Sequence, residues 1–185
     1  MQLKINKDEL VYDGKYIKTY RRHFTDRDGI ARTWDMVKRN SFGRIVAIAA
    51  ITDQNEIVME KIYRIPCEKY IYELPAGLMD KPGESEEQAI TRELLEETGY
   101  KAEKVELLTN GPFNTGLVKD ELAMYLGLGV KKIQEPELEA AEDIEVFTIP
   151  LKDLFKFIVE HQKNGSVDLK IASVIPFLKA KGLPV

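Results

Sequence analysis

Residues 73–100, ELPAGLMDKPGESEEQAITRELLEETGY, join a stretch rich in proline and glycine to a segment that carries many carboxylates. Proline and glycine at this density interrupt regular structure and turn the backbone. Ser85 and Gln88 have the spacing of a capping box, and Gly99 has the position of a helix stop. The sequence therefore predicts a loop followed by a helix over residues 86–98.

The predicted helix carries like charges on one face. Glu93 and Glu97 are four residues apart, and Glu96 adjoins them, which destabilises an isolated helix. One explanation is a solvated acidic surface, the usual fate of a charge run. The other is a hard divalent cation such as Mg²⁺, which binds carboxylate oxygens together with substrate phosphates. Ile90 and Leu94 form an apolar stripe beside the acidic one, so one edge of the helix can pack while the other faces a cleft.

These residues resemble the signature of the Nudix hydrolases. Glu84, a spacing of seven residues and then RELLEETGY at 92–100 match that signature throughout. Six residues instead of five separate Gly77 from Glu84, and the extra one falls in the turn at 80–83, where insertions are tolerated. The resemblance covers residue 29 to the end. It implies an α/β (α+β) fold, the Nudix α/β/α sandwich with a mixed β-sheet.

Composition narrows the class of protein. The 185 residues suit one domain, and a net charge of −4 argues against a nucleic-acid binder, which would present a basic surface. The longest apolar run, residues 45–51, is too short to span a membrane. The first ten residues lack the apolar core of a signal peptide, and the lone Cys67 gives no sign of an oxidising compartment. We expect a cytoplasmic enzyme with no membrane or nucleic-acid partner.

The N-terminal part reads as a separate element. Polar and apolar residues alternate over 9–13, 15–24 and 30–39, with turn residues between these segments, which predicts antiparallel strands. We therefore expect a strand extension over residues 1–42 and a Nudix domain over 43–185. The plain interpretation of the extension is structural.

The segment RTWDMVKR at 32–39 resembles the ADP-ribose pyrophosphatases of the same superfamily. The resemblance implies that Trp34 stacks on adenine and that Arg39 reaches the phosphates. It also implies that both belong to the partner subunit of a domain-swapped homodimer with shared active sites. An indole suits a purine, and a guanidinium suits phosphate oxygens. The alternative is that Trp34 is a packing residue.

The same resemblance assigns further site residues. Arg64 lies at the end of a strand predicted over 56–64, where an arginine of the resembled enzymes contacts the ribose-phosphate portion of the substrate. The alternative is a surface arginine at a strand end. Glu73 corresponds to a substrate-contacting glutamate. The backbone carbonyl of Ala76 corresponds to a metal ligand. The metal set is then completed by the carboxylates Glu93, Glu96 and Glu97, with Mg²⁺ as the ion and Mn²⁺ as an alternative.

A general base is expected from the acidic segment EPELEAAED at 135–143. The resemblance favours Glu142, with Glu139 as second choice, and Glu96 is included among the catalytic carboxylates. A flexible solvated turn is the alternative. The remaining elements are predicted as strands over 44–51, 71–74, 102–109, 122–130 and 144–150, a loop over 110–116, and helices over 151–163 and from 166 onward.

The function implied is Mg²⁺-dependent hydrolysis of ADP-ribose to AMP and ribose 5-phosphate. Residues 113–121 match the ADP-ribose branch only loosely, so another nucleoside diphosphate sugar, such as UDP-glucose or GDP-mannose, stays open. A catalytically silent Nudix module that senses a nucleotide is the third reading. Three clustered acids at 93–97 argue against it, because a sensor does not need them. Arg92 is expected to fix these carboxylates by ion pairing.

Overall fold

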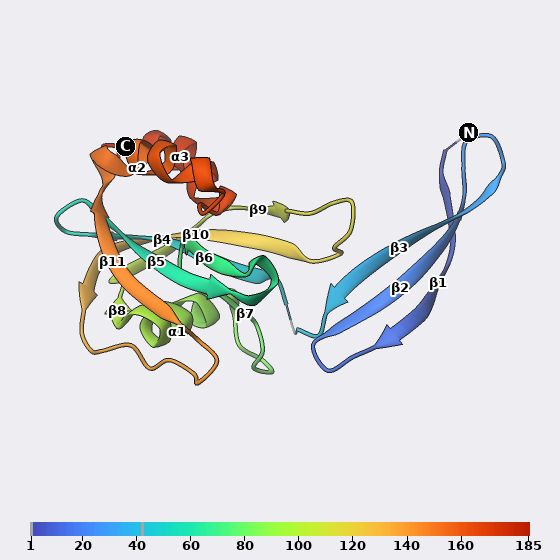
Figure 1. Ribbon diagram of the computed structural model, residues 1–185, viewed down its shortest axis with the longest axis horizontal. Helices are drawn as coiled ribbons and strands as arrows, with labels where there is room; N and C mark the ends of the chain where they lie inside the picture. Colours follow the sequence, from blue (N-terminus) through green and yellow to red (C-terminus); the bar gives the residue numbers. More distant parts are fainter. Residues whose placement is uncertain (1, 42) are drawn as a thin grey trace.

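A computed structural model describes residues 2–41 and 43–185, which form two β-sheets and three α-helices (Figure 1). The strands of the N-terminal sheet are β1 (Lys4–Asp13), β2 (Ile17–Thr25) and β3 (Ala31–Arg39). Those of the large sheet are β4 (Ile45–Thr52), β5 (Glu56–Arg64), β6 (Lys69–Glu73), β7 (Ala76–Leu78), β8 (Tyr100–Lys101), β9 (Lys104–Pro112), β10 (Glu121–Lys132) and β11 (Ile144–Pro150). The helices are α1 (Glu86–Thr98), α2 (Leu154–His161) and α3 (Leu169–Ala180).

The large sheet is mixed. Its main order is β11-β5-β4-β10-β8, with β6 added to β5, β7 to β4 and β9 to β10. β4 and β10 run parallel, and the other pairs are antiparallel. Residues 46–52 of β4 are all buried, as expected for an apolar strand that is covered on both faces.

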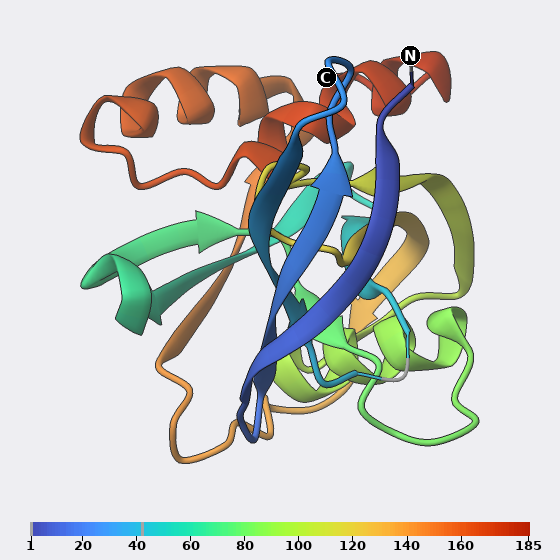
Figure 2. The ribbon, with the colours of Figure 1, turned by 90° about the vertical axis from the view of Figure 1, so that its right-hand side faces the viewer.

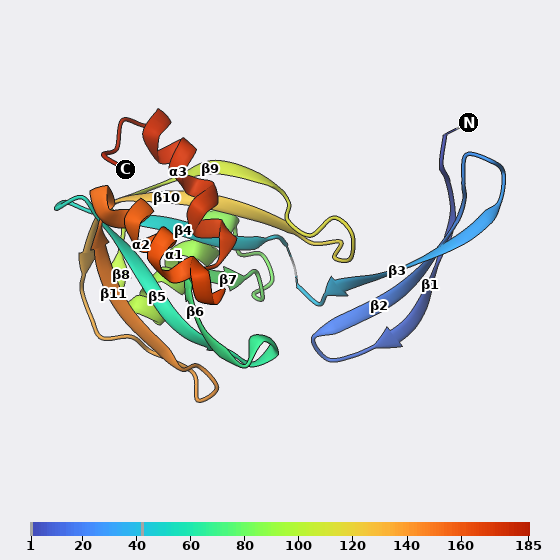
Figure 3. The ribbon, with the colours of Figure 1, turned by 45° about the horizontal axis from the view of Figure 1, so that its top comes forward.

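Helices cover both faces of this sheet. Figure 1 shows α1 on one side and α2 with α3 on the other, and Figure 3 shows α2 and α3 lying over the strands. Ile90 and Leu94 of α1 pack in one core cluster with Ile48. Leu154 and Ile171 pack in a second cluster on the opposite face. The predicted α/β/α sandwich with a mixed sheet is confirmed.

The N-terminal strands form an antiparallel sheet of their own, in the order β1-β2-β3. Figure 1 shows this sheet projecting from the end of the larger body, and Figure 2 shows its three strands side by side in front of that body. It is joined to the β9–β10 connection by backbone hydrogen bonds, from the Val37 amide to the Leu117 carbonyl (2.8 Å) and from the Lys119 amide to the Val37 carbonyl (2.9 Å). The predicted boundary after residue 42 rests on Phe42, which lies outside the described residues.

The predicted ends and buried face of α1 are confirmed. Ser85 and Gln88 form both hydrogen bonds of the capping box, and Gly99 ends the helix with a φ of 75°. Ile90 and Leu94 are fully buried. The helix therefore begins and ends where its own sequence predicts.

Other predictions were wrong where distant pairing decides the structure. Residues 76–78 are predicted in a loop, but they form β7, because they pair with β4, where Ala76 lies opposite Ala47. Residues 110–112 were also expected in a loop, but β9 runs to Pro112, because it pairs with β10 as far as Glu121. The helix predicted over 151–163 is divided into α2 and two flanking 3₁₀ turns. Within residues 2–41 and 43–185, none of the helices combines the length and apolar character needed to cross a membrane.

Candidate active site

The acidic edge of α1 lies against β7. The backbone amide of Ala76 donates a hydrogen bond to Oε2 of Glu97 (3.1 Å). A Cβ at Gly77 would overlap the carboxyl group of Glu93, so a glycine is needed for this close approach. The chain thus brings the Pro-Ala-Gly segment and two of the predicted metal-binding carboxylates into contact.

Arg92 holds the acidic group together, as the sequence predicted. Its guanidinium contacts Glu84 at 2.9 and 3.1 Å, Glu93 at 3.0 Å and Glu96 at 2.9 Å. Asp80 adds a contact at 3.2 Å. The Glu96 side chain keeps 40% of its surface exposed, whereas the Glu97 residue is buried. Glu96 therefore lies at the outer edge of the group and Glu97 at its inner edge.

A carboxylate that the sequence did not reveal faces Glu97. Glu60 of β5 is 1% exposed, and its Oε1 atom has no hydrogen-bond partner. Burial raises the pKa of Glu60 to about 8, against the effect of a hydrogen bond with the Glu97 carboxyl. Burial also raises the pKa of Glu97, and the nearby charge of Glu60 adds to the rise. The signal was present in the sequence, because Glu60 interrupts the apolar face formed by Val58 and Ile62.

Burial raises the pKa of Glu93 as well, to about 7, although Arg92 opposes the rise. Glu142 contributes charge repulsion to both Glu60 and Glu97, so it lies near their carboxyl groups. Its Oε2 atom accepts a hydrogen bond from the Glu139 amide (2.8 Å). Of the two candidates for the general base, Glu142 is half-buried and raises the pKa of both buried acids, whereas Glu139 is exposed.

A cleft of about 430 Å³ opens beside this acidic group. It brings together four of the residues singled out from the sequence, namely Arg39, Arg64, Glu73 and Ala76. Arg64 donates two hydrogen bonds to the Glu73 carboxylate (2.6 and 3.1 Å). Arg39 donates to Asp120 (3.0 Å). The cleft therefore presents two guanidinium groups next to the segment that contacts Glu97.

The same cleft contains a third cation, Lys170 of α3. Its Nζ atom lies 3.5 Å from Oε2 of Glu73, and it also donates to Asp168, which caps α3. From the sequence, this part of the chain is predicted only as a helix that begins at residue 166. Nothing local indicates that Lys170 reaches a glutamate 97 residues away.

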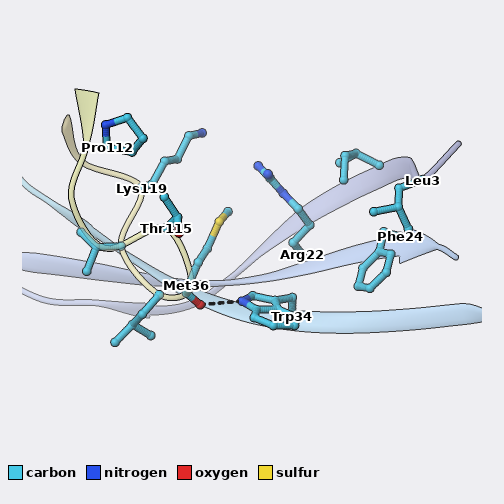
Figure 4. Close-up of a pocket in the computed structure, with 12 residues that line it drawn as sticks. Leu3, Arg22, Phe24, Trp34, Met36, Pro112, Thr115 and Lys119 are labelled. Carbon is cyan, nitrogen blue, oxygen red and sulfur yellow. Dashed lines mark hydrogen bonds between the residues drawn. The ribbon is translucent and has the colours of Figure 1, made fainter. Parts of the chain in front are cut away.

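Trp34 lies outside this cleft. It lines a separate pocket of about 440 Å³ with Phe24, Met36 and the connection that follows Pro112 (Figure 4). The indole is 56% exposed, and its N–H donates to the Gly116 carbonyl (2.9 Å). Within one chain, Arg39 thus joins the cleft and Trp34 does not.

The residues fit a divalent cation. Among residues 2–41 and 43–185, no three acidic, histidine or cysteine side chains already converge on one point that could hold a metal ion. However, Glu93 and Glu97 contact the segment that carries the Ala76 carbonyl, and Glu60 offers a buried oxygen without a partner. Carboxylate and carbonyl oxygens are the ligands that Mg²⁺ prefers.

Comparison with known proteins shows the family to which the chain belongs. The model of the NUDIX domain matches residues 42–168. The chain is 33% identical to the ADP-ribose pyrophosphatase of Bacillus subtilis over 94% of this chain and 90% of that protein. It is 32% identical to the methanol dehydrogenase activator of Bacillus methanolicus, over 85% and 83% of the two chains. A crystal structure of an ADP compounds hydrolase superimposes with a TM-score of 0.82 at 20% identity, covering 100% of this chain and 98% of that one. The chain therefore belongs to the Nudix family, as a hydrolase similar to its ADP-ribose pyrophosphatase members.

Proposed function

We propose that this protein is a Mg²⁺-dependent pyrophosphatase that hydrolyses ADP-ribose, or a closely related nucleoside diphosphate sugar, to AMP and ribose 5-phosphate. The observation that carries the proposal is the cleft in which Arg39, Arg64 and Glu73 lie beside Ala76, against the buried acids of α1. The similarity to a Bacillus subtilis ADP-ribose pyrophosphatase favours this substrate.

The cations of the cleft suit a diphosphate. Arg39 and Arg64 offer planar donor forks, which match phosphate oxygens, and Lys170 adds a point charge. Arg64 and Lys170 are already held by Glu73, so they are oriented before any ligand arrives. Glu73 also leaves acceptor capacity on its carboxylate for a hydroxyl of the sugar.

The acids supply the other half of the site. Glu93, Glu96 and Glu97, with the Ala76 carbonyl, would hold Mg²⁺, or Mn²⁺ as an alternative. When bound, the ion neutralises charge on the phosphates and favours attack by an oxygen nucleophile. Glu142 takes the proton of the attacking water, a new P–O bond forms, and the bridging P–O bond breaks. Glu142 is preferred to Glu139 because it lies near Glu60 and Glu97.

The N-terminal strands are proposed to join two chains into a homodimer with shared sites. Apolar side chains stay exposed on this sheet, among them Leu10, Val11 and Tyr12 of β1. Large exposed apolar patches are typical of interaction surfaces. Because Trp34 does not reach the cleft of its own chain, stacking on adenine requires the cleft of the partner subunit.

A substrate panel tests the activity. Nucleoside diphosphate sugars are incubated with Mg²⁺, and phosphate is measured after a phosphatase removes it from the products. We expect ADP-ribose to be the best substrate. Glu97→Gln should lower kcat by at least about a hundredfold, the scale for losing one electrostatic stabiliser. Glu87→Gln is the control, because Glu87 is an exposed residue of the same helix. Equal activity of both variants and the wild type would refute the assignment of Glu97.

The shared site has its own test. Trp34→Ala should raise KM for ADP-ribose by roughly 5- to 150-fold with little change in kcat, because base stacking is worth about 1–3 kcal/mol and is lost equally in the ground and transition states. Mixed dimers of Trp34→Ala and Glu97→Gln chains should regain activity at low substrate, since one of the two sites then carries neither change. A monomer in solution, or no recovery after subunit exchange, would show that Trp34 is a packing residue.

A further inference from the structure

Glu60 is a buried charge-bearing group in the middle of the large sheet. It lies on β5 and pairs with Glu73 of β6 on one side and Val146 of β11 on the other. The residue is 1% exposed, and Oε1 makes no hydrogen bond within the described part of the chain. Buried polar atoms nearly always have a partner, and buried charges are paired with an opposite charge or coordinate a metal. An unpartnered carboxylate oxygen here therefore requires an explanation.

The ionisable neighbours of Glu60 are mostly acids. Three of them, Glu73, Glu97 and Glu142, are acids from three different segments. Arg64 is the nearby cation, but its Nε and Nη2 atoms both donate to Glu73. Glu97, in turn, has its Oε2 atom on the Ala76 amide. Arg64 therefore adds some positive charge near Glu60, but it directs these two hydrogen bonds to Glu73, and the Oε1 atom of Glu60 has no partner within the described part of the chain.

We propose that Glu60 is a further ligand of the divalent cation, binding it through its free carboxylate oxygen next to Glu97. The inference rests on the proposed function, because it assumes that the acids of α1 hold the cation. It extends the site from one helix and one loop to the interior strand β5. The cation would then be held between the helix and the sheet, and it would link Glu97 of α1 to Glu60 of β5.

A measurement of cation binding in the absence of substrate tests whether Glu60 is a ligand. Mn²⁺ is titrated into the full chain, free Mn²⁺ is followed by its EPR signal, and Mg²⁺ is measured by competition. Glu60→Gln keeps the shape of the side chain and removes the charge, so the fold should persist. We expect the cation affinity of Glu60→Gln to fall by about tenfold or more, the scale for losing a metal ligand or a residue that orients one. Glu60→Asp, which retains the charge but is one methylene shorter, should bind more tightly than Glu60→Gln.

Two further variants separate the possible failures. Glu145→Gln on the adjacent strand β11 is the control, because its carboxylate is exposed and pairs with Lys61, and its affinity should equal that of the wild type. Glu97→Gln reports on the cation site as a whole. If Glu97→Gln loses binding and Glu60→Gln does not, Glu60 is a neutral buried acid and the inference is wrong. If neither variant loses binding, the proposed cation site is wrong as well.

Discussion

Replacing Gly77 with alanine should displace the Glu93 carboxylate and little else. Gly77 does not have a positive φ, so an alanine fits its backbone without strain. The new Cβ would overlap Cδ, Cγ and Oε1 of Glu93 by more than about 1 Å relative to ordinary van der Waals separation. The Glu93 side chain must therefore rotate away and give up its hydrogen bond to Arg92 (3.0 Å).

Gly77→Ala should affect activity more than it affects the free energy of unfolding. Losing a charge-assisted hydrogen bond costs about 1.5–3 kcal/mol, and replacing glycine with alanine returns about 0.4–1 kcal/mol through the unfolded state. The net loss in the free energy of unfolding should be about 1–2 kcal/mol. The effect on activity should be larger, because a displacement of about 1 Å in a reactive site can lower kcat about a hundredfold. Mg²⁺ is also sensitive to the displacement, since it requires nearly ideal octahedral geometry.

The assay combines urea unfolding, Mn²⁺ binding and kcat with ADP-ribose. Glu87→Gln is the control, because Glu87 is an exposed residue of the same helix as Glu93. A Gly77→Ala, Glu93→Gln double variant should be no worse than Glu93→Gln alone, since both changes act on one carboxylate. Full activity in Gly77→Ala, or additive losses in the double variant, would refute the reasoning.

Two other predictions concern stability. Ser85→Ala removes one hydrogen bond of the capping box and should lower the free energy of unfolding by about 1 kcal/mol, measured by urea unfolding. In a chelator, stability should also fall as pH rises from about 4.5 to about 7. The folded state retains a proton on Glu93, whose pKa is raised to about 7, while the unfolded chain has already released it. This loss is on the order of 3 kcal/mol, and Glu93→Gln should make the pH dependence between about pH 5 and pH 8 less steep, while Glu60 and Glu97, whose pKa values are also raised, maintain part of it. Identical slopes for the two proteins would contradict the assignment.

Much of the fold could be predicted because its signals are local. The capping residues and Gly99 fix the ends of α1 through hydrogen bonds within a few residues. The apolar run at residues 45–51 predicts a buried strand by composition alone, and it forms most of β4. In contrast, β7 is a strand only because β4 lies beside it, and no pattern within three residues can report a partner about 30 positions away.

In the candidate site, too, some residues are recognisable from local sequence and others only from contacts between distant segments. The acids of α1 stand out by their spacing in one helix. Glu60 is visible in the sequence only as a charge within an apolar strand face, and its position beside Glu97 depends on tertiary packing. Lys170 likewise becomes part of the cleft because α3 folds back to Glu73. Such contacts depend on tertiary packing, which propensity and periodicity do not encode.

The parallel pair of β4 and β10 has a consequence for how the chain folds as it is made. Its register joins Ile45 to Leu122, so the two halves of this pair are separated by about 75 residues. The N-terminal strands, by comparison, pair with immediate neighbours, as Asp13 does with Lys18. During synthesis the N-terminal sheet can therefore form early. The edge of β4 that pairs with β10 stays unpaired until β10 has been made. During that interval this edge of β4 is open to association with other chains, and the length of the interval is set by the connection between β4 and β10 rather than by the active-site helix within it.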